Sequence, residues 1–139
     1  MEKSIIDLII KLKKFCMEDE EQIRTICKVS LAEYKGIIVI NEGERLTCNL
    51  LSKKMGLSPS RGSRIIDNLV KKEYLLRMVN PEDRRSFVIS LSSRGARLKS
   101  QIEQERNSCE RRIRNKLSAK EVELIKEGLE LINKIFNQK

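Results

Sequence analysis

The sequence predicts a mainly α-helical fold that carries one small β-hairpin. Hydrophobic residues make up 40% of the 139 residues and aromatic residues only 4%, with no Trp, which favours a core of Ile, Leu and Val between helices. The period of the apolar residues is helical along most of the chain, but it changes to that of strands at Leu75 and becomes helical again after Ser93. No repeat or Pro/Gly-rich linker divides the sequence. We therefore expect a single domain over residues 1–139.

The N-terminal segment is predicted to form two helices. Apolar residues recur at helical spacing over residues 3–17, namely Ile5, Leu8, Ile9, Leu12 and Cys16. A short helix over residues 22–28 is expected after the acidic residues 18–21. Ile6 and Ile10 widen the apolar face of the first helix, so that helix needs more than one surface to pack against. Asp7 and Lys11 interrupt the apolar run, which excludes a signal peptide and a membrane span and favours a cytoplasmic protein.

Capping residues predict the starts of three further helices, over residues 30–40, 48–55 and 59–72. Ser30 and Glu33 form a capping box, in which each side chain accepts a hydrogen bond from the backbone N–H of the other. Thr47 is the expected cap of the next helix. Ser58 caps the third, where Pro59 occupies the first helical position at no cost in hydrogen bonds.

The alternating segments 76–79 and 86–91 flank a turn at residues 80–83 and predict a β-hairpin. A long helix is expected from Ser93 to Lys116, and Ser118 with Glu121 forms a second capping box that starts the last helix. That last helix carries a wide apolar stripe, which includes Val122, Ile125, Leu129, Ile132 and Phe136. We interpret the stripe as a dimer interface shared with the first helix; packing within one chain is the alternative.

The charge of the chain is concentrated in one segment. Its net charge is +9. Residues 53–99 contain 12 Lys and Arg against 4 Asp and Glu, which gives +8 for that segment and leaves +1 for the rest. Such a segment suits the phosphates of a nucleic acid, because each neutralised phosphate releases condensed counterions. A solvated basic face, RNA or an acidic membrane surface would agree with the charge alone.

Two short helices joined at Gly56, followed by a hairpin, make a winged helix-turn-helix. A helical wheel of residues 59–72 places an apolar face on one side, formed by Gly62, Ile65, Ile66 and Leu69. Ser60, Arg64, Asp67 and Lys71 lie opposite. Hydroxyl groups and N-terminal N–H groups can bind phosphates, and an arginine can bind the edge of guanine in the major groove. Asp83, Arg84 and Arg85 lie at the tip of the hairpin, where an extended guanidinium can enter the minor groove.

Residues 57–95 resemble the MarR family of transcriptional regulators. The resemblance rests on L-S-P-S at 57–60, S-R at 63–64, D-x-L at 67–69, D-x-R at 83–85 and L-S-S-x-G at 91–95. It implies a DNA-binding lobe over residues 30–95 and dimerisation helices over 1–29 and 96–139. It further implies a homodimeric repressor that binds a palindromic operator in double-stranded DNA and is released by a small-molecule effector or an oxidant.

The resemblance also implies roles for individual residues. Residues of the recognition helix would face DNA, namely Ser58, Ser60, Arg61, Ser63 and Arg64. Arg85 would enter the minor groove, oriented by Asp83, with Arg84 near the backbone. The sequence departs from the family pattern in this region, at Arg61, Gly62, Asn68 and Glu73. We expect Gly62 to weaken the helix by up to about 1 kcal/mol relative to Ala, and Glu73, in place of a usual glycine, to deprive the helix of its C-cap.

The four cysteines lack a disulfide spacing. Cys16, Cys27 and Cys109 fall on apolar stripes and are interpreted as buried structural thiols. Cys48 would begin a helix, where the partial positive charge lowers a thiol pKa. A redox role for Cys16 or Cys48 is therefore a hypothesis.

Other function classes find less support in the residues. The absence of His disfavours a zinc site, and we expect no metal and no cofactor. No phosphate-binding Gly-rich loop or carboxylate cluster indicates an enzyme. The alternative function is a winged-helix protein–protein module without specific DNA readout.

Overall fold

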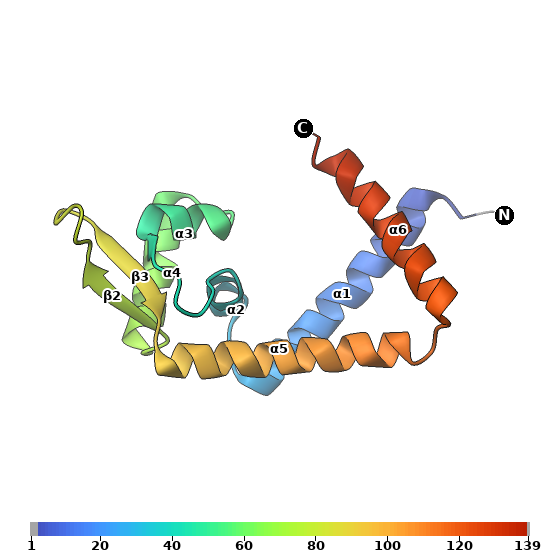
Figure 1. Ribbon diagram of the computed structural model, residues 1–139, viewed down its shortest axis with the longest axis horizontal. Helices are drawn as coiled ribbons and strands as arrows, with labels where there is room; N and C mark the ends of the chain where they lie inside the picture. The colour runs from blue at the N-terminus through green and yellow to red at the C-terminus, as the bar shows by residue number, and fades with distance from the viewer. Residues whose placement is uncertain (1–2, 139) are drawn as a thin grey trace. The chain divides into compact units, whose positions relative to one another are not determined.

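The computed structural model describes residues 3–138 (Figure 1). The chain divides into two compact units, which end and begin at Glu103 and Gln104, and each is considered by itself. The elements in chain order are α1 (Ile5–Cys27), α2 (Leu31–Ile38), β1 (Leu46–Thr47), α3 (Cys48–Lys54), α4 (Pro59–Lys71), β2 (Leu75–Val79), β3 (Phe87–Leu91), α5 (Ser93–Arg114) and α6 (Ala119–Phe136). The predicted fold class, mainly α-helical with a small β wing, is confirmed.

Helix α1 is one continuous helix, so the prediction of two helices separated at residues 18–21 is wrong. Ser4 and Asp7 form a capping box at its start, and Lys28 ends it in the left-handed conformation. The acidic residues 18–21 do not interrupt the helix, because Glu is a good helix former and this stretch contains neither Gly nor Pro. The charge pattern was therefore a poor indicator of a helix boundary.

The predicted N-cap residues of the central helices are confirmed; at Ser30 and Glu33 the geometry shows the hydroxyl half of the expected capping box. The hydroxyl groups of Ser30, Thr47 and Ser58 accept hydrogen bonds from the backbone N–H groups three residues later, at 3.1, 3.2 and 3.3 Å. Helix α2 ends at Ile38, two residues earlier than predicted. Gly56 adopts a φ of +71° in the turn between α3 and α4, a conformation in which glycine carries no steric penalty.

The wing contains three antiparallel strands in the order β1-β3-β2, whereas the sequence predicted two. Strands β2 and β3 form the expected hairpin, with Leu75 opposite Leu91 and Val79 opposite Phe87. The additional strand β1 has only two residues and pairs Leu46 with Ile89. A strand that short has no periodicity of its own, which is why the sequence did not reveal it.

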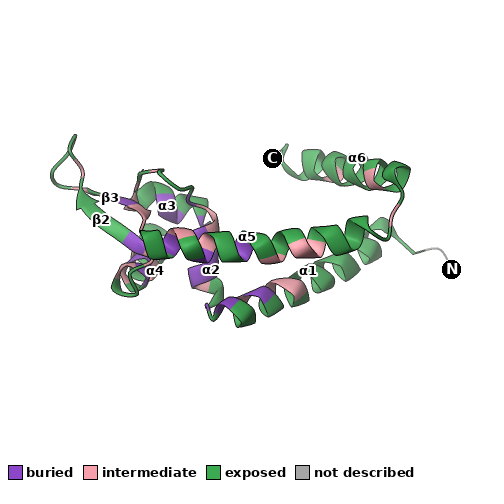
Figure 2. Cartoon of the chain, turned by 60° about the horizontal axis from the view of Figure 1, so that its bottom comes forward, coloured by how far each residue is buried: buried purple, intermediate pink, exposed green. Residues whose placement is uncertain are grey.

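The core of the first unit lies where α2, α3 and α4 meet the sheet and the first part of α5 (Figure 2). Several aliphatic side chains there are fully excluded from solvent, namely Ile37, Ile40, Leu51, Ile66, Leu69, Ile89 and Ile102. The aliphatic composition of this core agrees with the low aromatic content of the chain. The core joins α4 and the hairpin in one packed body.

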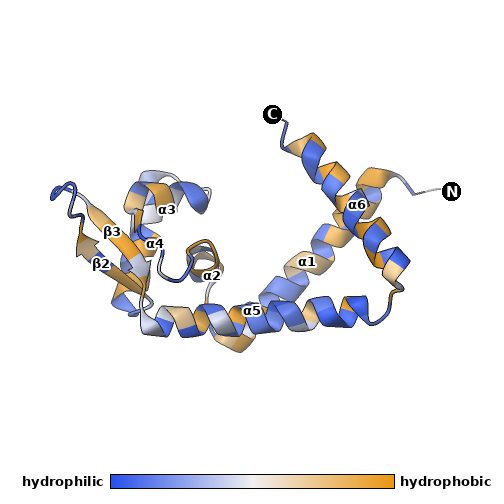
Figure 3. Cartoon of the chain, in the orientation of Figure 1, coloured by the Kyte–Doolittle hydropathy of each residue, from blue (hydrophilic) through white to orange (hydrophobic). Residues whose placement is uncertain are grey.

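Helices α1 and α6 leave large apolar side chains exposed in the single chain (Figure 3). In α1 these include Ile5, Ile10 and Phe15, and in α6 they include Leu124, Leu131 and Ile135. None of the described residues of α6 is buried. No helix within residues 3–138 is both long enough and apolar enough to cross a lipid bilayer.

Candidate nucleic-acid interface

Helix α4 presents its polar face to solvent, as the helical wheel predicted. Gly62, Ile66 and Leu69 are buried, and Ile65 is half-buried. Ser58, Ser60, Arg61 and Arg64 are exposed, while Ser63 is half-buried. Near the start of the helix, the Ser58 and Ser60 hydroxyl oxygens lie 3.4 Å apart. This part of the helix therefore combines hydroxyl groups, two guanidinium groups and the positive end of the helix dipole.

Gly62 is the point of closest approach between α4 and α3. A Cβ atom at residue 62 would lie 1.9 Å from Ser52 Oγ, 2.3 Å from Ser52 Cβ and 3.0 Å from Ser52 Cα. Ser52 is itself buried, and its hydroxyl donates to the Cys48 carbonyl oxygen at 2.7 Å. Gly62 is therefore required for packing, because the two helices can cross in near contact only without a Cβ at this position. The sequence predicted only its lower helix propensity.

The C-terminal end of α4 is capped, contrary to the expectation drawn from Glu73. Glu73 itself adopts the left-handed conformation, with a φ of +65°. The Tyr74 N–H donates to the Leu69 carbonyl oxygen at 2.9 Å, and the Glu73 N–H donates to the Val70 carbonyl oxygen at 3.0 Å. These are the hydrogen bonds of a glycine-type C-cap. The cap therefore forms without glycine, at the steric cost that a Cβ has in this region.

Two ion pairs connect α4 to its neighbours. Lys72 Nζ lies 2.8 Å from Glu33 Oε1 of α2. Asp67 pairs with Arg77 of β2, and the Arg77 guanidinium also lies 5.7 Å from the centre of the Phe87 ring. Alternation along β2 places Arg77 on the same side of the strand as the buried Leu75, the side that packs on α4. The recognition helix is therefore joined both to α2 and to the wing.

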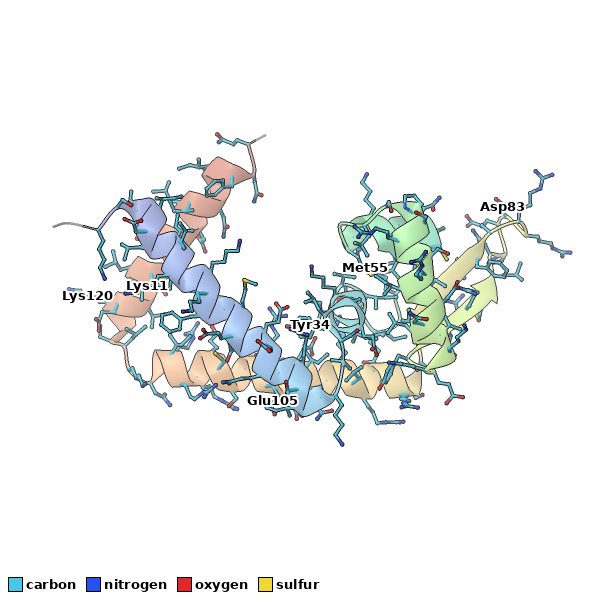
Figure 4. All side chains as sticks on the ribbon, turned by 180° about the vertical axis from the view of Figure 1, so that it is seen from behind. Lys11, Tyr34, Met55, Asp83, Glu105 and Lys120 are labelled. Atoms are coloured by element: carbon cyan, nitrogen blue, oxygen red, sulfur yellow. The ribbon has the colours of Figure 1, made fainter. Side chains whose placement is uncertain are left out.

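The tip of the wing is ordered by short polar contacts. The Asp83 N–H donates to the Asn80 carbonyl oxygen at 3.2 Å, which confirms the predicted turn. Asp83 Oδ1 accepts a hydrogen bond from the backbone N–H of Arg85 at 3.0 Å. Asp83 thus acts on the backbone that carries Arg85. Figure 4 labels Asp83 at the end of the hairpin, where side chains with terminal nitrogen atoms point away from the helices.

Comparison with known proteins matches residues 29–87 to the model of the MarR family. Over this segment, which is 59 of the 139 residues, the chain is similar to the MarR family. A curated relative, the uncharacterized HTH-type transcriptional regulator YfiV of Bacillus subtilis, is 26% identical over 106 residues. That alignment covers 76% of this chain and spans 66% of the length of YfiV, just under two thirds.

Solved structures of other proteins share the fold of this chain. The structure of Rv1404 from Mycobacterium tuberculosis has a TM-score of 0.83 at 19% identity and covers 96% of this chain and 95% of its own. A mutant of S. aureus MepR bound to an oligodeoxyribonucleotide has a TM-score of 0.69 at 19% identity, with 97% and 99% of the two chains covered. At these identities the comparison establishes the fold.

Glu33 is a buried ionisable residue of the first unit. This carboxylate is 9% exposed. Burial alone would raise the pKa of Glu33, but the Lys72 ammonium group and hydrogen bonds from Ser30 outweigh burial and lower it. The side chain is therefore ionised at neutral pH, and the buried charge is balanced across the α2–α4 boundary.

The lowered thiol pKa expected for Cys48 at the start of α3 is not found. Cys48 is half-buried. Burial raises the pKa of its thiol, and the charge of Asp67 adds to this effect, while Arg77 opposes it. A backbone interaction at the start of α3 lowers the pKa, but burial outweighs it. Of the three cysteines interpreted as buried, Cys27 is buried, Cys109 is half-buried and Cys16 is exposed in the single chain.

Several residues that hold the interface in place were not identified from the sequence. Besides Glu33, Ser52 and Arg77, they include Lys99 of α5. The Lys99 ammonium group donates to the carbonyl oxygens of Ile38, at 3.3 Å, and of Ile40, and thereby satisfies the C-terminal end of α2. No sequence period marks such contacts, since Lys99 and Ile38 are 61 residues apart.

Proposed function

We propose that this chain is a sequence-specific DNA-binding transcription regulator, a homodimer that represses transcription from a palindromic operator. The observation that carries the proposal is the arrangement of the first unit: one packed body presents the serines and arginines of α4 and, beside it, a wing with Arg84 and Arg85 exposed at its tip. A helix suits the major groove and an extended arginine suits the minor groove. The DNA-bound MepR mutant, which has the same fold, supports this assignment.

The individual contacts are part of the same proposal. Ser58, Ser60 and Ser63 would bind phosphates together with the N–H groups at the start of α4, and Arg61 and Arg64 would read base edges. Arg85 would enter the minor groove from the wing, while Arg84 would bind the backbone. Asp83 would contribute indirectly, because its carboxylate fixes the backbone of Arg85.

The exposed apolar faces of α1 and α6 support a homodimer. A soluble monomer rarely exposes a large contiguous apolar surface, and a second copy offers both faces in symmetric form. Two copies would place two recognition helices about 34 Å apart, one turn of DNA, on a palindrome. Light scattering during gel filtration would measure the mass, and a monomer at micromolar concentration would contradict this part of the proposal.

Selection of duplexes from a random pool, followed by fluorescence anisotropy, would test the DNA-binding function. We expect the selected duplex to bind at least about 10³-fold more tightly than a scrambled duplex at the same salt concentration. Equal affinity for both duplexes would exclude specific readout and favour a protein–protein module.

The variant Arg85→Ala tests the wing contact. It is expected to weaken binding to the selected duplex by at least about tenfold, since a specific arginine contact is worth about 1–3 kcal/mol. Arg106→Ala, a change of the same kind at an exposed position in α5, is the matched control. Thermal stability should be unchanged in both; a loss of stability in Arg85→Ala comparable to its loss of affinity would show a structural role instead.

Release by a small molecule or an oxidant completes the proposal. Among the thiols, the exposed Cys16 is the better candidate for oxidation, because burial raises the pKa of Cys48. Peroxide is expected to weaken operator binding by the wild type and to leave binding by Cys16→Ser unchanged. Equal sensitivity of the two proteins would contradict a role for Cys16.

A further inference from the structure

A buried carboxylate lies behind the recognition helix and contacts it at one point. Glu33 of α2 is 9% exposed, and its Oε1 atom accepts a hydrogen bond from Lys72 Nζ at 2.8 Å. Its other oxygen, Oε2, is buried and has no hydrogen-bond partner within the part of the chain that the structure describes. Ser30 also interacts with this carboxylate from within the same segment, and Lys72 is the partner that reaches it from the end of α4.

Stability is a poor explanation for this arrangement. Removing a carboxylate from water is costly, and a buried ion pair repays that cost only when its remaining hydrogen-bonding positions are filled. Here one carboxylate oxygen lacks a partner among residues 3–138. The Lys72 side chain is 53% exposed, so water also screens the attraction between the two charges. A role beyond stability would explain why two opposite charges stand at this boundary.

The position of Lys72 suggests such a role. Lys72 is the C-cap residue of α4, and β2 of the wing begins three residues later, at Leu75. Two elements proposed to contact DNA therefore meet at the residue that Glu33 holds. The connection between them passes through Glu73, whose φ of +65° marks a sharp change of direction. A small shift at this junction is carried along the hairpin to Arg85 at the tip.

Other contacts also reach α4 and the junction: Asp67 pairs with Arg77 of β2, and the Glu73 and Tyr74 carbonyl oxygens accept hydrogen bonds from Ser92. Ile66 and Leu69 pack in the core, and Gly62 touches α3 near the opposite end of the helix. Gly62 lies ten residues before Lys72, or about 15 Å along a helix axis. Close-packed side chains hold α4 against the core, and Asp67 ties its middle to the wing. The pair of Glu33 with Lys72 differs from these contacts because it is an ion pair that ties the C-terminal end of α4 to α2.

We propose that Glu33 is a positioning residue: through Lys72 it fixes the junction between the recognition helix and the wing, and so sets how sharply the protein discriminates among DNA sequences. The inference rests on the proposed DNA-binding function. It assigns no contact with DNA to Glu33 itself, which is buried behind α4.

The variant Glu33→Gln tests the inference, with Glu44→Gln as the matched control. Both changes remove one negative charge from the first unit. Glu44 forms a similar pair with Lys54, at 3.2 Å, but this pair joins the loop before β1 to the end of α3 and does not involve α4. Each protein would be titrated against the selected duplex and a scrambled duplex at a temperature at which all are folded. The ratio of the two dissociation constants is the measure of specificity.

We expect the ratio to fall about tenfold in Glu33→Gln and to stay within twofold of wild type in Glu44→Gln. Affinity for the scrambled duplex should rise slightly and equally in both variants, because both become more positive. A purely structural role for Glu33 would lower the melting temperature and leave the ratio unchanged, and that result would overturn the inference. A wild-type ratio near one would overturn the proposed function, and with it this inference.

A double variant separates positioning from folding if Glu33→Gln is unstable. Glu33→Met combined with Lys72→Met removes both charges and leaves neither of them without its partner, so it should be no less stable than either single change to Met. Its specificity ratio is expected to fall as in Glu33→Gln. Lys71→Met removes the neighbouring exposed charge and controls for the loss of one lysine from the basic face. A double variant that keeps the wild-type ratio would show that packing alone positions the helix.

Discussion

Gly62→Ala is the most direct test of how α3 and α4 are packed. The new Cβ atom would lie 2.3 Å from Ser52 Cβ and 3.0 Å from Ser52 Cα, whereas carbon atoms in contact are about 3.5–4.0 Å apart. The Ser52 hydroxyl can rotate away, but its Cβ and Cα atoms are fixed to the backbone. The two helices must therefore separate by more than about 1 Å, within a core that is close-packed.

The expected change in the free energy of unfolding has three contributions. Overpacking of this kind costs about 1–3 kcal/mol, and the upper end applies because backbone atoms are involved. Loss of the hydrogen bond from Ser52 to the Cys48 carbonyl oxygen adds about 1 kcal/mol. The better helix propensity of Ala returns about 1 kcal/mol. We expect Gly62→Ala to lower the free energy of unfolding by about 2–3 kcal/mol.

Urea denaturation followed by circular dichroism would measure this change, at one fixed protein concentration because a dimer's stability depends on it. Gly36→Ala is the matched control. Gly36 is also a buried glycine in a helix, but its Cβ would meet the flexible end of the Leu69 side chain, at 2.7 Å. There the packing cost and the gain in propensity should cancel to within about 1 kcal/mol.

A double-mutant cycle gives the result that would refute the reasoning. Ser52→Gly removes both side-chain atoms that the new methyl group would strike. Combined with Gly62→Ala, it should recover at least about 1 kcal/mol relative to the sum of the single changes. Equal stabilities of Gly62→Ala and Gly36→Ala, or strictly additive changes in the cycle, would show that the approach at Gly62 does not limit the packing.

Two further predictions concern stability. Glu73→Gly should raise the free energy of unfolding by about 0.5–1 kcal/mol, because glycine adopts the left-handed conformation without a steric penalty; Glu73→Ala should give no such gain in urea denaturation. The ion pair of Glu33 should stabilise the wild type above pH 4.5, the ordinary value for this group, and lose this contribution as the pH falls through its lowered pKa. A wild-type advantage over Glu33→Gln that persists unchanged at pH 3 would contradict the sign of this shift.

The elements of the fold were largely predictable from the sequence because their signals are local. Ser58 and Pro59 define the start of α4 by hydrogen bonds and a fixed φ within one turn of helix. Similarly, the alternation of side chains around residues 80–83 was sufficient for the hairpin. The helix boundary predicted inside α1 is wrong, because the acidic residues 18–21 are compatible with a continuous helix.

The candidate site likewise has some properties that the sequence predicts and others that it does not. Exposure of Ser60, Arg61 and Arg64 followed from the helical wheel, since the period of a helix fixes which residues oppose the apolar face. The action of Asp83 on the backbone of Arg85 did not follow, because it depends on the exact turn at the hairpin tip. The raised pKa of the Cys48 thiol could not be predicted either, because it depends on burial by segments distant in sequence.

The sequence by itself therefore determined the order of the elements, the concentration of positive charge in residues 53–99 and the polar face of α4. These properties arise from local hydrogen bonding, side-chain period and composition. The tertiary structure decided what holds that face in place: the close approach of Gly62 to Ser52, the pair of Asp67 with Arg77, and the contact of Glu33 with Lys72. Glu33 and Lys72 are 39 residues apart, and only folding brings such groups together, because it is the shared core that sets their distance.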